Sequence, residues 1–141
     1  MKILVAADGS RFTKRMLAYL AAHDESFGAK QHQFTVLTVV APIPARAAGA
    51  LSKKIVHGYY ADEAEATFKP IRAFFAKQGV DAEFEHRIGN AGEQIAAFAR
   101  KGKFDLVMMG SHGHGALARL VVGSVTTRVL ASCEVPLLIV R

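Results

Sequence analysis

The fold is decided by residues 104–115, FDLVMMGSHGHG, where an apolar run enters a glycine-rich loop. The run from Phe104 to Met109 has the length and the near-continuous apolarity of a strand that is covered on both faces. Ten residues beyond Gly113, the pair Gly123-Ser124 opens an apolar pattern with helical spacing. A buried strand that runs through a loop into a helix is typical of a parallel α/β sheet.

The same alternation continues toward the N-terminus and toward the C-terminus. Residues from Val80 to Ile88 alternate between apolar and charged side chains, which predicts a strand with one solvated face at the edge of a sheet. Helical patterns separate all the strands, so the sequence predicts a doubly wound α/β fold with one five-stranded parallel sheet, right-handed crossovers and helices on both faces. The other predicted strands are Lys2 to Ala7, Phe34 to Val40 and Pro136 to Val140.

The helices are delimited less clearly than the strands. Thr13 is the expected N-cap of the first helix, and Asn90 begins a capping box for the third. The second helix is indicated by apolar spacings of four, three and four from Ala64 to Phe75. Pro70 lies inside it and predicts either a kink or a late first turn. The segment from Pro42 to Gly58 shows no clear period.

Length and composition indicate one cytoplasmic domain covering residues 1–141. Just over half of the residues are hydrophobic, 51%, which is enough to form a core. The lone Cys133 forms no internal disulfide, and the start of the chain reads as a strand rather than as a signal peptide. No apolar run approaches the ~20 residues that a membrane-spanning helix needs.

The net charge of +6 favours anionic partners in general. The cations are scattered among acids, and no Cys/His finger spacing or aromatic-interleaved basic strand occurs, so nucleic acid is not the expected partner. A nucleotide satisfies the same electrostatics.

The glycine-rich loop and the helix after it suit a phosphate. Glycines let backbone amides approach an anion closely, and a helix beginning at Ser124 offers free N–H groups and the positive end of its dipole. The hydroxyls of Ser111, Ser124 and Thr126 could add donors. Nearby candidates for positive charge are His112, His114 and Arg119.

Two better-known phosphate motifs are excluded by the residues themselves. A P-loop would continue with Lys and Ser or Thr after Gly115, where this chain has Ala116-Leu117. A dinucleotide fingerprint would follow the first strand, where the chain reads Ala7-Asp8-Gly9-Ser10.

The pattern Gly110-x-x-Gly113, nine residues, then Gly123-Ser124 resembles the G-2x-G-9x-G-[S/T] signature of ATP-binding universal stress proteins. The resemblance extends over essentially the whole chain. It implies an adenine nucleotide alpha hydrolase-like fold with strand order 3-2-1-4-5. It also implies a homodimer formed through the last strand, Pro136 to Val140, and ATP with Mg²⁺ in the cleft between the first and fourth strands.

Carried over to this sequence, the resemblance places Asp8 and Val39 beside the adenosine, and Met109 and Gly110 on the ribose side. Gly113 and the start of the last helix would surround the phosphates. Many members of the family have proline where this chain has Ala6, which leaves the approach to that loop less rigid. The full expected site is Ala7, Asp8, Val39, Met109, Gly110, Ser111, His112, Gly113, Gly123, Ser124, Val125 and Thr126.

Other interpretations stay open beside this one. Asp8 could simply support the turn before the first helix. Nucleotide occupancy could alter dimer or partner contacts, or the protein could be a slow ATPase, although no dedicated catalytic arrangement is evident. A nucleotide-free interaction module is disfavoured by the intact glycine signature. A response-regulator receiver is excluded, because Ile139-Val140-Arg141 lacks its lysine.

Overall fold

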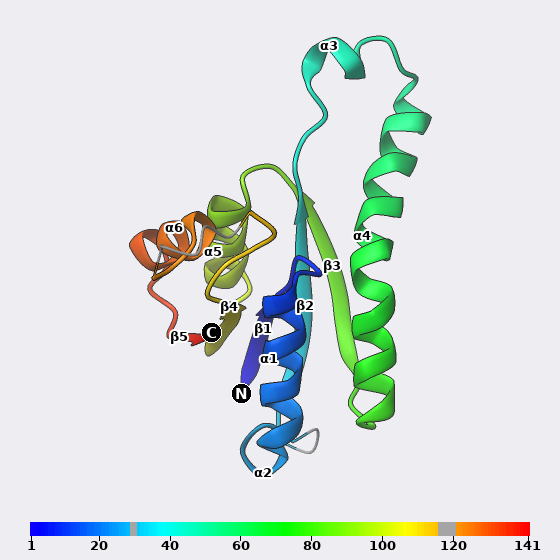
Figure 1. Cartoon of the computed structure of the whole chain (residues 1–141). Coiled ribbons are helices and arrows are strands. Elements are labelled where there is room, and N and C mark those ends of the chain that lie inside the picture. Colours follow the sequence, from blue (N-terminus) through cyan, green and yellow to red (C-terminus); the bar gives the residue numbers. More distant parts are fainter. Residues whose placement is uncertain (29–30, 116–120) are drawn as a thin grey trace.

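The computed structural model describes residues 1–28, 31–115 and 121–141, and its centre is a five-stranded parallel sheet (Figure 1). The strand order is β3-β2-β1-β4-β5, which confirms the order 3-2-1-4-5 expected above. The strands are β1 Lys2–Ala6, β2 Gln33–Val40, β3 Ala82–Ile88, β4 Leu106–Gly110 and β5 Leu137–Val140.

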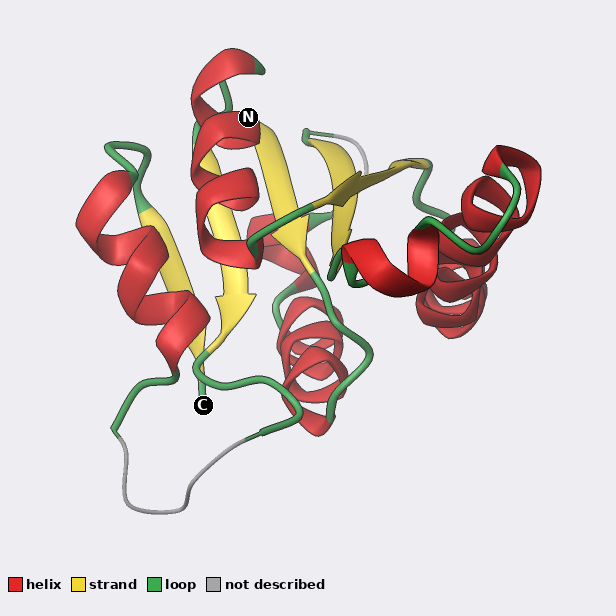
Figure 2. Cartoon of the chain, turned by 90° about the horizontal axis from the view of Figure 1, so that it is seen from above, coloured by secondary structure: helices red, strands yellow, loops and turns green. Residues whose placement is uncertain are grey.

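Helices cover both faces of this sheet (Figure 2). The side chains of β1 explain the two layers, because successive residues of a strand point to opposite faces. Ile3 and Val5 pack in one apolar cluster with α1 (Arg11–Ala22) and α4 (Lys53–Lys77). Leu4 and Ala6 pack in a second cluster with α5 (Ala91–Lys101) and α6 (Ser124–Ser132).

Strand register brings three carboxyl ends together at one edge of the sheet. Ala6, the last residue of β1, is paired with Leu37 of β2 on one side and with Met109 of β4 on the other. The order of the strands reverses at β1, since β2 follows it in the chain but β4 lies on its other side. Doubly wound sheets bind ligands beyond the strand ends at such a reversal.

The predicted N-cap of α1 is wrong by three residues. Ser10 caps the helix, and its Oγ accepts a hydrogen bond from the Phe12 N–H over 3.2 Å. The Thr13 hydroxyl is used by the loop instead, where it accepts from the N–H groups of Asp8 and Gly9. A capping residue and a loop-bracing residue are both polar and close in sequence, so periodicity alone does not separate them.

The region between β2 and β3 contains more helix than the sequence predicts. A short α3, Ala45–Ala48, forms in the segment without a clear period, and α4 begins at Lys53. Pro70 therefore lies in the interior of α4, and the interpretation of Pro70 as a late first turn is wrong. A second short helix, α2 (Asp24–Phe27), follows α1.

The strand boundaries and the third long helix agree better with the prediction. Asn90 caps α5 as expected, with its Oδ1 accepting from the Glu93 N–H over 3.1 Å. β3 forms the edge of the sheet and keeps its alternation of half-buried and exposed side chains. None of the helices in the described part of the chain combines the length and apolarity needed to cross a bilayer.

Candidate functional site

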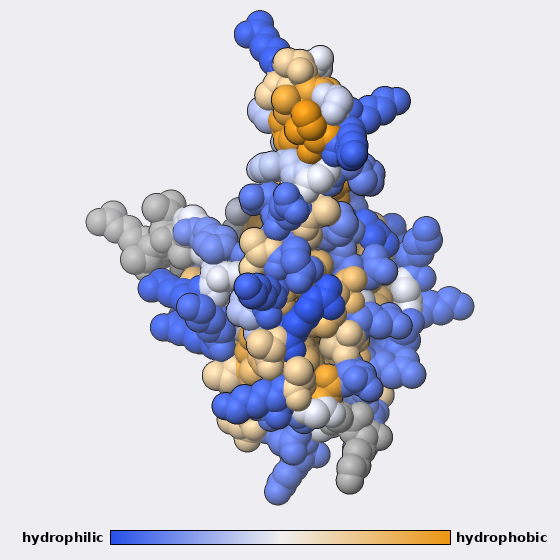
Figure 3. All heavy atoms as spheres, turned by 90° about the vertical axis from the view of Figure 1, so that its right-hand side faces the viewer, coloured by the Kyte–Doolittle hydropathy of each residue, from blue (hydrophilic) through white to orange (hydrophobic). Residues whose placement is uncertain are grey.

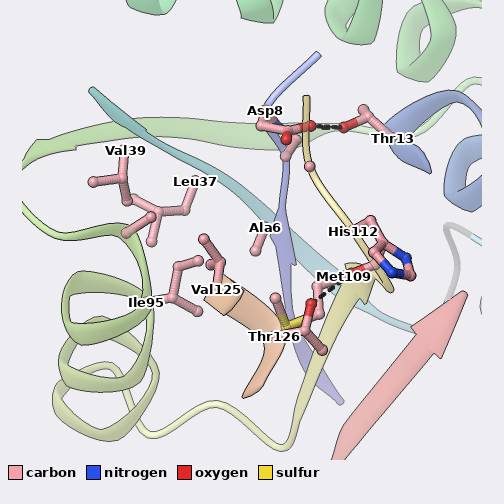
Figure 4. Close-up of a pocket in the computed structure, with 14 residues that line it drawn as sticks. Ala6, Asp8, Thr13, Leu37, Val39, Ile95, Met109, His112, Val125 and Thr126 are labelled. Carbon is pink, nitrogen blue, oxygen red and sulfur yellow. Dashed lines mark hydrogen bonds between the residues drawn. The ribbon is translucent and has the colours of Figure 1, made fainter. Parts of the chain in front are cut away.

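A pocket lies where the carboxyl ends of β1, β2 and β4 meet the first turns of α5 and α6 (Figure 4). The loops after β1 and β4 close it on the polar side. It is the place expected for a ligand in a doubly wound sheet. Its lining residues are Ala6, Ala7, Asp8, Thr13, Leu37, Val39, Ala91, Ile95, Met109, Gly110, His112, Gly113, Val125 and Thr126.

One side of the pocket is apolar. Leu37 and Val39 face it from the same side of β2, and Ile95 and Val125 face it from α5 and α6 (Figure 4). Val39 and Val125 are only partly buried, so their side chains are available to a ligand. A flat aromatic group such as a nucleobase fits surfaces of this kind.

The other side of the pocket is formed by the loop after β1, which Asp8 holds in shape. Asp8 Oδ1 accepts hydrogen bonds from the Ser10 N–H over 2.9 Å and from the Thr13 hydroxyl over 3.0 Å. Asp8 thus has the turn-supporting role that the sequence left open. Its Oδ2 has no hydrogen-bond partner among the described residues and remains available to a ligand.

The glycine-rich loop after β4 packs directly on the loop after β1. A Cβ on Gly113 would lie 2.7 Å from Asp8 Oδ2, and a Cβ on Gly110 would lie 2.5 Å from the Phe12 Cβ. His114 Nε2–H donates to the Asp8 carbonyl over 2.7 Å, since a carbonyl can only accept, and this bond ties the two loops together. Gly113 is therefore required by close packing between the two loops, and Gly110 by the close approach of the end of β4 to α1.

Thr126 fixes the start of α6 to the same loop. Its hydroxyl, which is almost completely buried, donates to the Gly110 carbonyl over 2.9 Å. The Gly123 N–H donates to the Ser111 carbonyl over 2.7 Å. The hydroxyl proton of Thr126 and the amide of Gly123 are thus already bonded within the chain, and the Thr126 hydroxyl is not a free donor in this structure.

The N-terminus of α6 keeps open amides. Gly123 is its N-cap and supplies no side-chain acceptor, and the first turn contains no acidic residue. The first helical hydrogen bond runs from the Thr127 N–H to the Gly123 carbonyl, so the N–H groups of residues 124–126 bond to nothing else in the described chain. Such a terminus binds anions through its amides and its dipole.

Nine of the twelve expected site residues line this one pocket. Of the other three, Ser111 is buried behind the loop, Gly123 forms the cap of α6, and Ser124 is exposed at its first turn. His112 lines the pocket, with its ring 5.1 Å from that of Phe12 and Nδ1 3.0 Å from the Ser111 hydroxyl. Arg119 lies outside the described residues.

Five lining residues are absent from the expected site, namely Ala6, Thr13, Leu37, Ala91 and Ile95. Leu37 could have been found from the period of two that it shares with Val39. Ala91 and Ile95 lie one turn apart on α5, and the sequence does not show which face of that helix meets the pocket. Among the described lining residues, Asp8 carries the only carboxylate, and the described chain holds no group of three potential metal ligands.

The comparisons with known proteins agree with this architecture. The profile of the universal stress protein family matches residues 1–141. The chain belongs to the universal stress protein family. A universal stress protein of Thermus aquaticus is 31% identical over 140 residues, which are 99% of this chain and 97% of the relative. A universal stress protein of Methanocaldococcus jannaschii, MJ0531, is 27% identical, with 99% of this chain and 81% of the relative covered.

Solved structures of universal stress proteins share the fold. UspA from Lactobacillus plantarum superposes with a TM-score of 0.80 at 21% identity, covering 100% of this chain and 97% of that one. A universal stress protein of Archaeoglobus fulgidus in complex with dAMP has a TM-score of 0.69 at 20% identity and covers 100% and 98%. An Arabidopsis thaliana family protein with AMP bound has a TM-score of 0.70 at 16% identity and covers 99% and 90%.

Proposed function

We propose that this universal stress protein binds an adenine nucleotide in the pocket between β1, β2 and β4, with ATP as its ligand. One observation carries the proposal: the apolar side of the pocket and the open N-terminus of α6 border the same space. A nucleotide has an apolar, flat base at one end and anionic phosphates at the other, so it matches both surfaces at once. The complexes of two structural relatives with dAMP and AMP support the adenine base.

In this proposal the base lies between Val39 and Val125, and the ribose hydroxyls reach Asp8 Oδ2. A carboxylate oxygen is a good acceptor for a ribose hydroxyl and a poor neighbour for phosphate, because the two would repel each other. Asp8 therefore orients the nucleotide, with its phosphates directed away from this carboxylate and toward the N-terminus of α6. Magnesium would be held chiefly by the phosphate oxygens, since hard oxygen ligands suit it and the described residues hold no group of three side chains placed to bind a metal ion.

Occupancy of the pocket would act on contacts with a second subunit or a partner. β5 is an edge strand of four apolar residues, all partly exposed, and such an edge can pair with another strand. The Ser111 N–H donates to the Val140 carbonyl over 2.8 Å, so the glycine-rich loop is bonded directly to the end of β5. We infer that a nucleotide which orders this loop strengthens a homodimer formed through Pro136 to Val140.

The test is to identify what the protein carries when it is purified without added nucleotide. The protein is denatured, and any released small molecule is identified by mass spectrometry and ultraviolet absorbance. We expect ATP or ADP close to one per chain. Protein that is empty and also fails to bind added Mg-ATP in calorimetry would overturn the proposal and leave a nucleotide-free interaction module.

A further inference from the structure

Residues 41–59, called the arm below, project from the carboxyl end of β2 beyond the sheet (Figure 1). The arm consists of α3 and the first two turns of α4, and none of its residues is buried. The first buried residue of α4 is Tyr60, whose hydroxyl accepts from the Ile43 N–H over 2.8 Å and anchors the root of the arm. The arm therefore adds nothing to the apolar core.

Large apolar side chains nevertheless gather on the arm (Figure 3). Leu51, Ile55 and Tyr59 are exposed by 43%, 57% and 44% and recur at intervals of four residues. Ile55 and Tyr59 lie one turn apart on α4, on the face opposite Tyr60 and Ala64, and Leu51 immediately precedes the N-cap Ser52. A regular apolar stripe that faces solvent marks a surface for contact with another molecule.

The charges along α4 change sign just beyond the arm. Arg46, Lys53 and Lys54 lie in the arm, which contains no acidic residue and so carries three of the net six positive charges of the chain. The next exposed charges are the acidic turn, defined as Asp62, Glu63 and Glu65. Of these six side chains only Glu65 forms an ion pair in the described chain, with Arg72.

These opposite charges cannot neutralise one another within one helix. Lys54 and Asp62 are two turns apart, about 12 Å at 1.5 Å per residue, whereas helical partners lie three or four residues apart. In addition, Lys53 and Lys54 stand in the first turn of α4, where the positive end of the helix dipole disfavours cations. An acidic group supplied from outside would relieve both conditions.

We propose that the outward face of residues 51–66 is a docking surface for the same face of a second copy of this chain, with the two α4 helices antiparallel. A two-fold axis near Gly58 brings Lys54 of each copy against Asp62 of the other, while Lys53, which lies on the other side of α4, adds its positive charge nearby. The contact is isologous, as expected between identical chains. Gly58 suits the axis, because a Cβ built there would meet nothing within 4 Å and the helices can approach closely.

The acidic turn also decides against an anionic membrane as the occupant. Asp62 follows Ile55 and Tyr59 on the outward face of α4, so a helix lying on a lipid surface would bring a carboxylate against anionic headgroups. A second copy accepts the same carboxylate beside its lysines. The surface is separate from β5 and from the pocket, so its test does not depend on the nucleotide.

Oxidative cross-linking tests the geometry. Gly58→Cys is made together with Cys133→Ala, so that the half-buried native thiol takes no part. Ala73→Cys in the same background is the control, because Ala73 is exposed on the outward face of α4 but lies outside the proposed contact. We expect covalent dimer from Gly58→Cys at several times the yield from Ala73→Cys on a non-reducing gel. Equal yields, or none from Gly58→Cys, would overturn the proposal.

Charge reversal in the Gly58→Cys background tests the recognition. Lys53→Glu/Lys54→Glu and Asp62→Lys/Glu63→Lys should each lower cross-linking about tenfold or more, since like charges then meet across the axis. All four side chains are exposed, and circular dichroism should show an unchanged fold. An equimolar mixture of the two variants should restore cross-linking, with the product containing one chain of each.

If the equimolar mixture of charge-reversed variants forms no covalent dimer, the proposed pairing of lysines with the acidic turn is overturned.

Binding of the arm to a lipid surface is tested by flotation with phosphatidylserine vesicles. If the wild-type chain floats with them, Lys53→Glu/Lys54→Glu does not, and Gly58→Cys forms no covalent dimer, the arm binds lipid and the proposal of a second copy is overturned.

Discussion

Two helices begin at the same pocket, and their N-termini are built in opposite ways. α5 is closed by its own sequence, because Asn90 caps it and Glu93 places a negative charge in its first turn. α6 begins at Gly123, with no side-chain cap and no acid in its first turn. Glu93 also pairs with Arg128 of α6, so the two helices are held together while only one terminus stays open.

This difference explains how one pocket provides two kinds of surface. At α5 the cap bonds one first-turn amide and Glu93 compensates the dipole, so α5 contributes apolar contacts from Ala91 and Ile95 to the pocket. An uncapped terminus costs helix stability and leaves three amides for a ligand. A nucleotide bound at α6 would recover that stability, which links occupancy of the pocket to the rigidity of the loop.

The largest effect is expected from Gly113→Val, which alters the glycine-rich loop beside the open N-terminus of α6. The Cβ that this substitution adds would lie only 2.7 Å from Asp8 Oδ2, and Asp8 is held in place through its Oδ1. The branched side chain would displace the Asp8 carboxylate and cover the loop amides. We expect ATP affinity to fall by about 100-fold or more, measured by calorimetry, because contacts at both ends of the nucleotide are lost.

Gly115→Val is the matched control for this loop. A Cβ on Gly115 meets no atom of the described residues within 4 Å, and neither glycine has a positive φ. The control should bind ATP like the wild-type protein, and both variants should keep their circular dichroism spectra. A folded Gly113→Val protein with unchanged affinity would remove the glycine-rich loop from the nucleotide site.

The next effect in size is expected from Gly123→Asp, which gives α6 the kind of cap that α5 has. The backbone of Gly123, with φ −73° and ψ 168°, already suits a capping aspartate. The carboxylate would bond to the first-turn amides and repel phosphate, so ATP affinity should fall about tenfold or more, while the cap itself changes the free energy of unfolding by only about a few tenths of a kcal/mol relative to glycine. Thermal unfolding and calorimetry on the same protein measure both changes.

Gly123→Ala separates the added carboxylate from the added carbon. A Cβ at this position would lie 3.1 Å from the His112 Cα. Alanine therefore adds the same steric cost as aspartate but no negative charge. If Gly123→Ala lowers ATP affinity as much as Gly123→Asp does, the amides of α6 are not the phosphate ligands, and the proposed orientation of the nucleotide is wrong.

The sheet and the position of the pocket could be predicted from the sequence because they depend on patterns that one strand or helix carries alone. Apolar runs and helical spacing located five strands and their order of alternation, and the G-2x-G-9x-G-S spacing located the loop beside the pocket. α3 and the first turns of α4 could not be found in this way. Those residues bury no face against the core, and the spacing of four from Leu51 to Tyr59 is too short to distinguish a helix from a loop.

The details of the site depended on contacts between segments far apart in the chain. Gly113 was expected to make room for an anion, whereas in the structure it makes room for Asp8. Thr126 was expected to donate to a phosphate, but its proton bonds the Gly110 carbonyl. A sequence pattern does not reveal which hydrogen-bond donors are already used within the chain, because the acceptor of each donor depends on how distant segments pack.

A smaller effect is expected from Asp8, which tests the nucleoside end of the pocket. Asp8→Asn keeps an acceptor for Ser10 and Thr13 and removes the charge. Affinity for adenosine should fall about three- to tenfold through the weaker bond to ribose. Affinity for tripolyphosphate should stay equal or rise, since a repulsive charge is lost. Equal losses for both ligands, measured by calorimetry, would move Asp8 to the phosphates.

The smallest effect on ATP binding is expected from Asn90→Ala, which removes the side-chain cap from the N-terminus of α5. Asn90 Oδ1 is the side-chain cap of α5, so its removal should lower the free energy of unfolding by about 1 kcal/mol in urea denaturation. ATP affinity should stay within about twofold of wild type, because Glu93 still places its negative charge at that terminus and keeps phosphate away. A change in ATP affinity as large as that of Gly123→Asp would mean that both termini bind phosphate and that their difference in capping has no functional meaning.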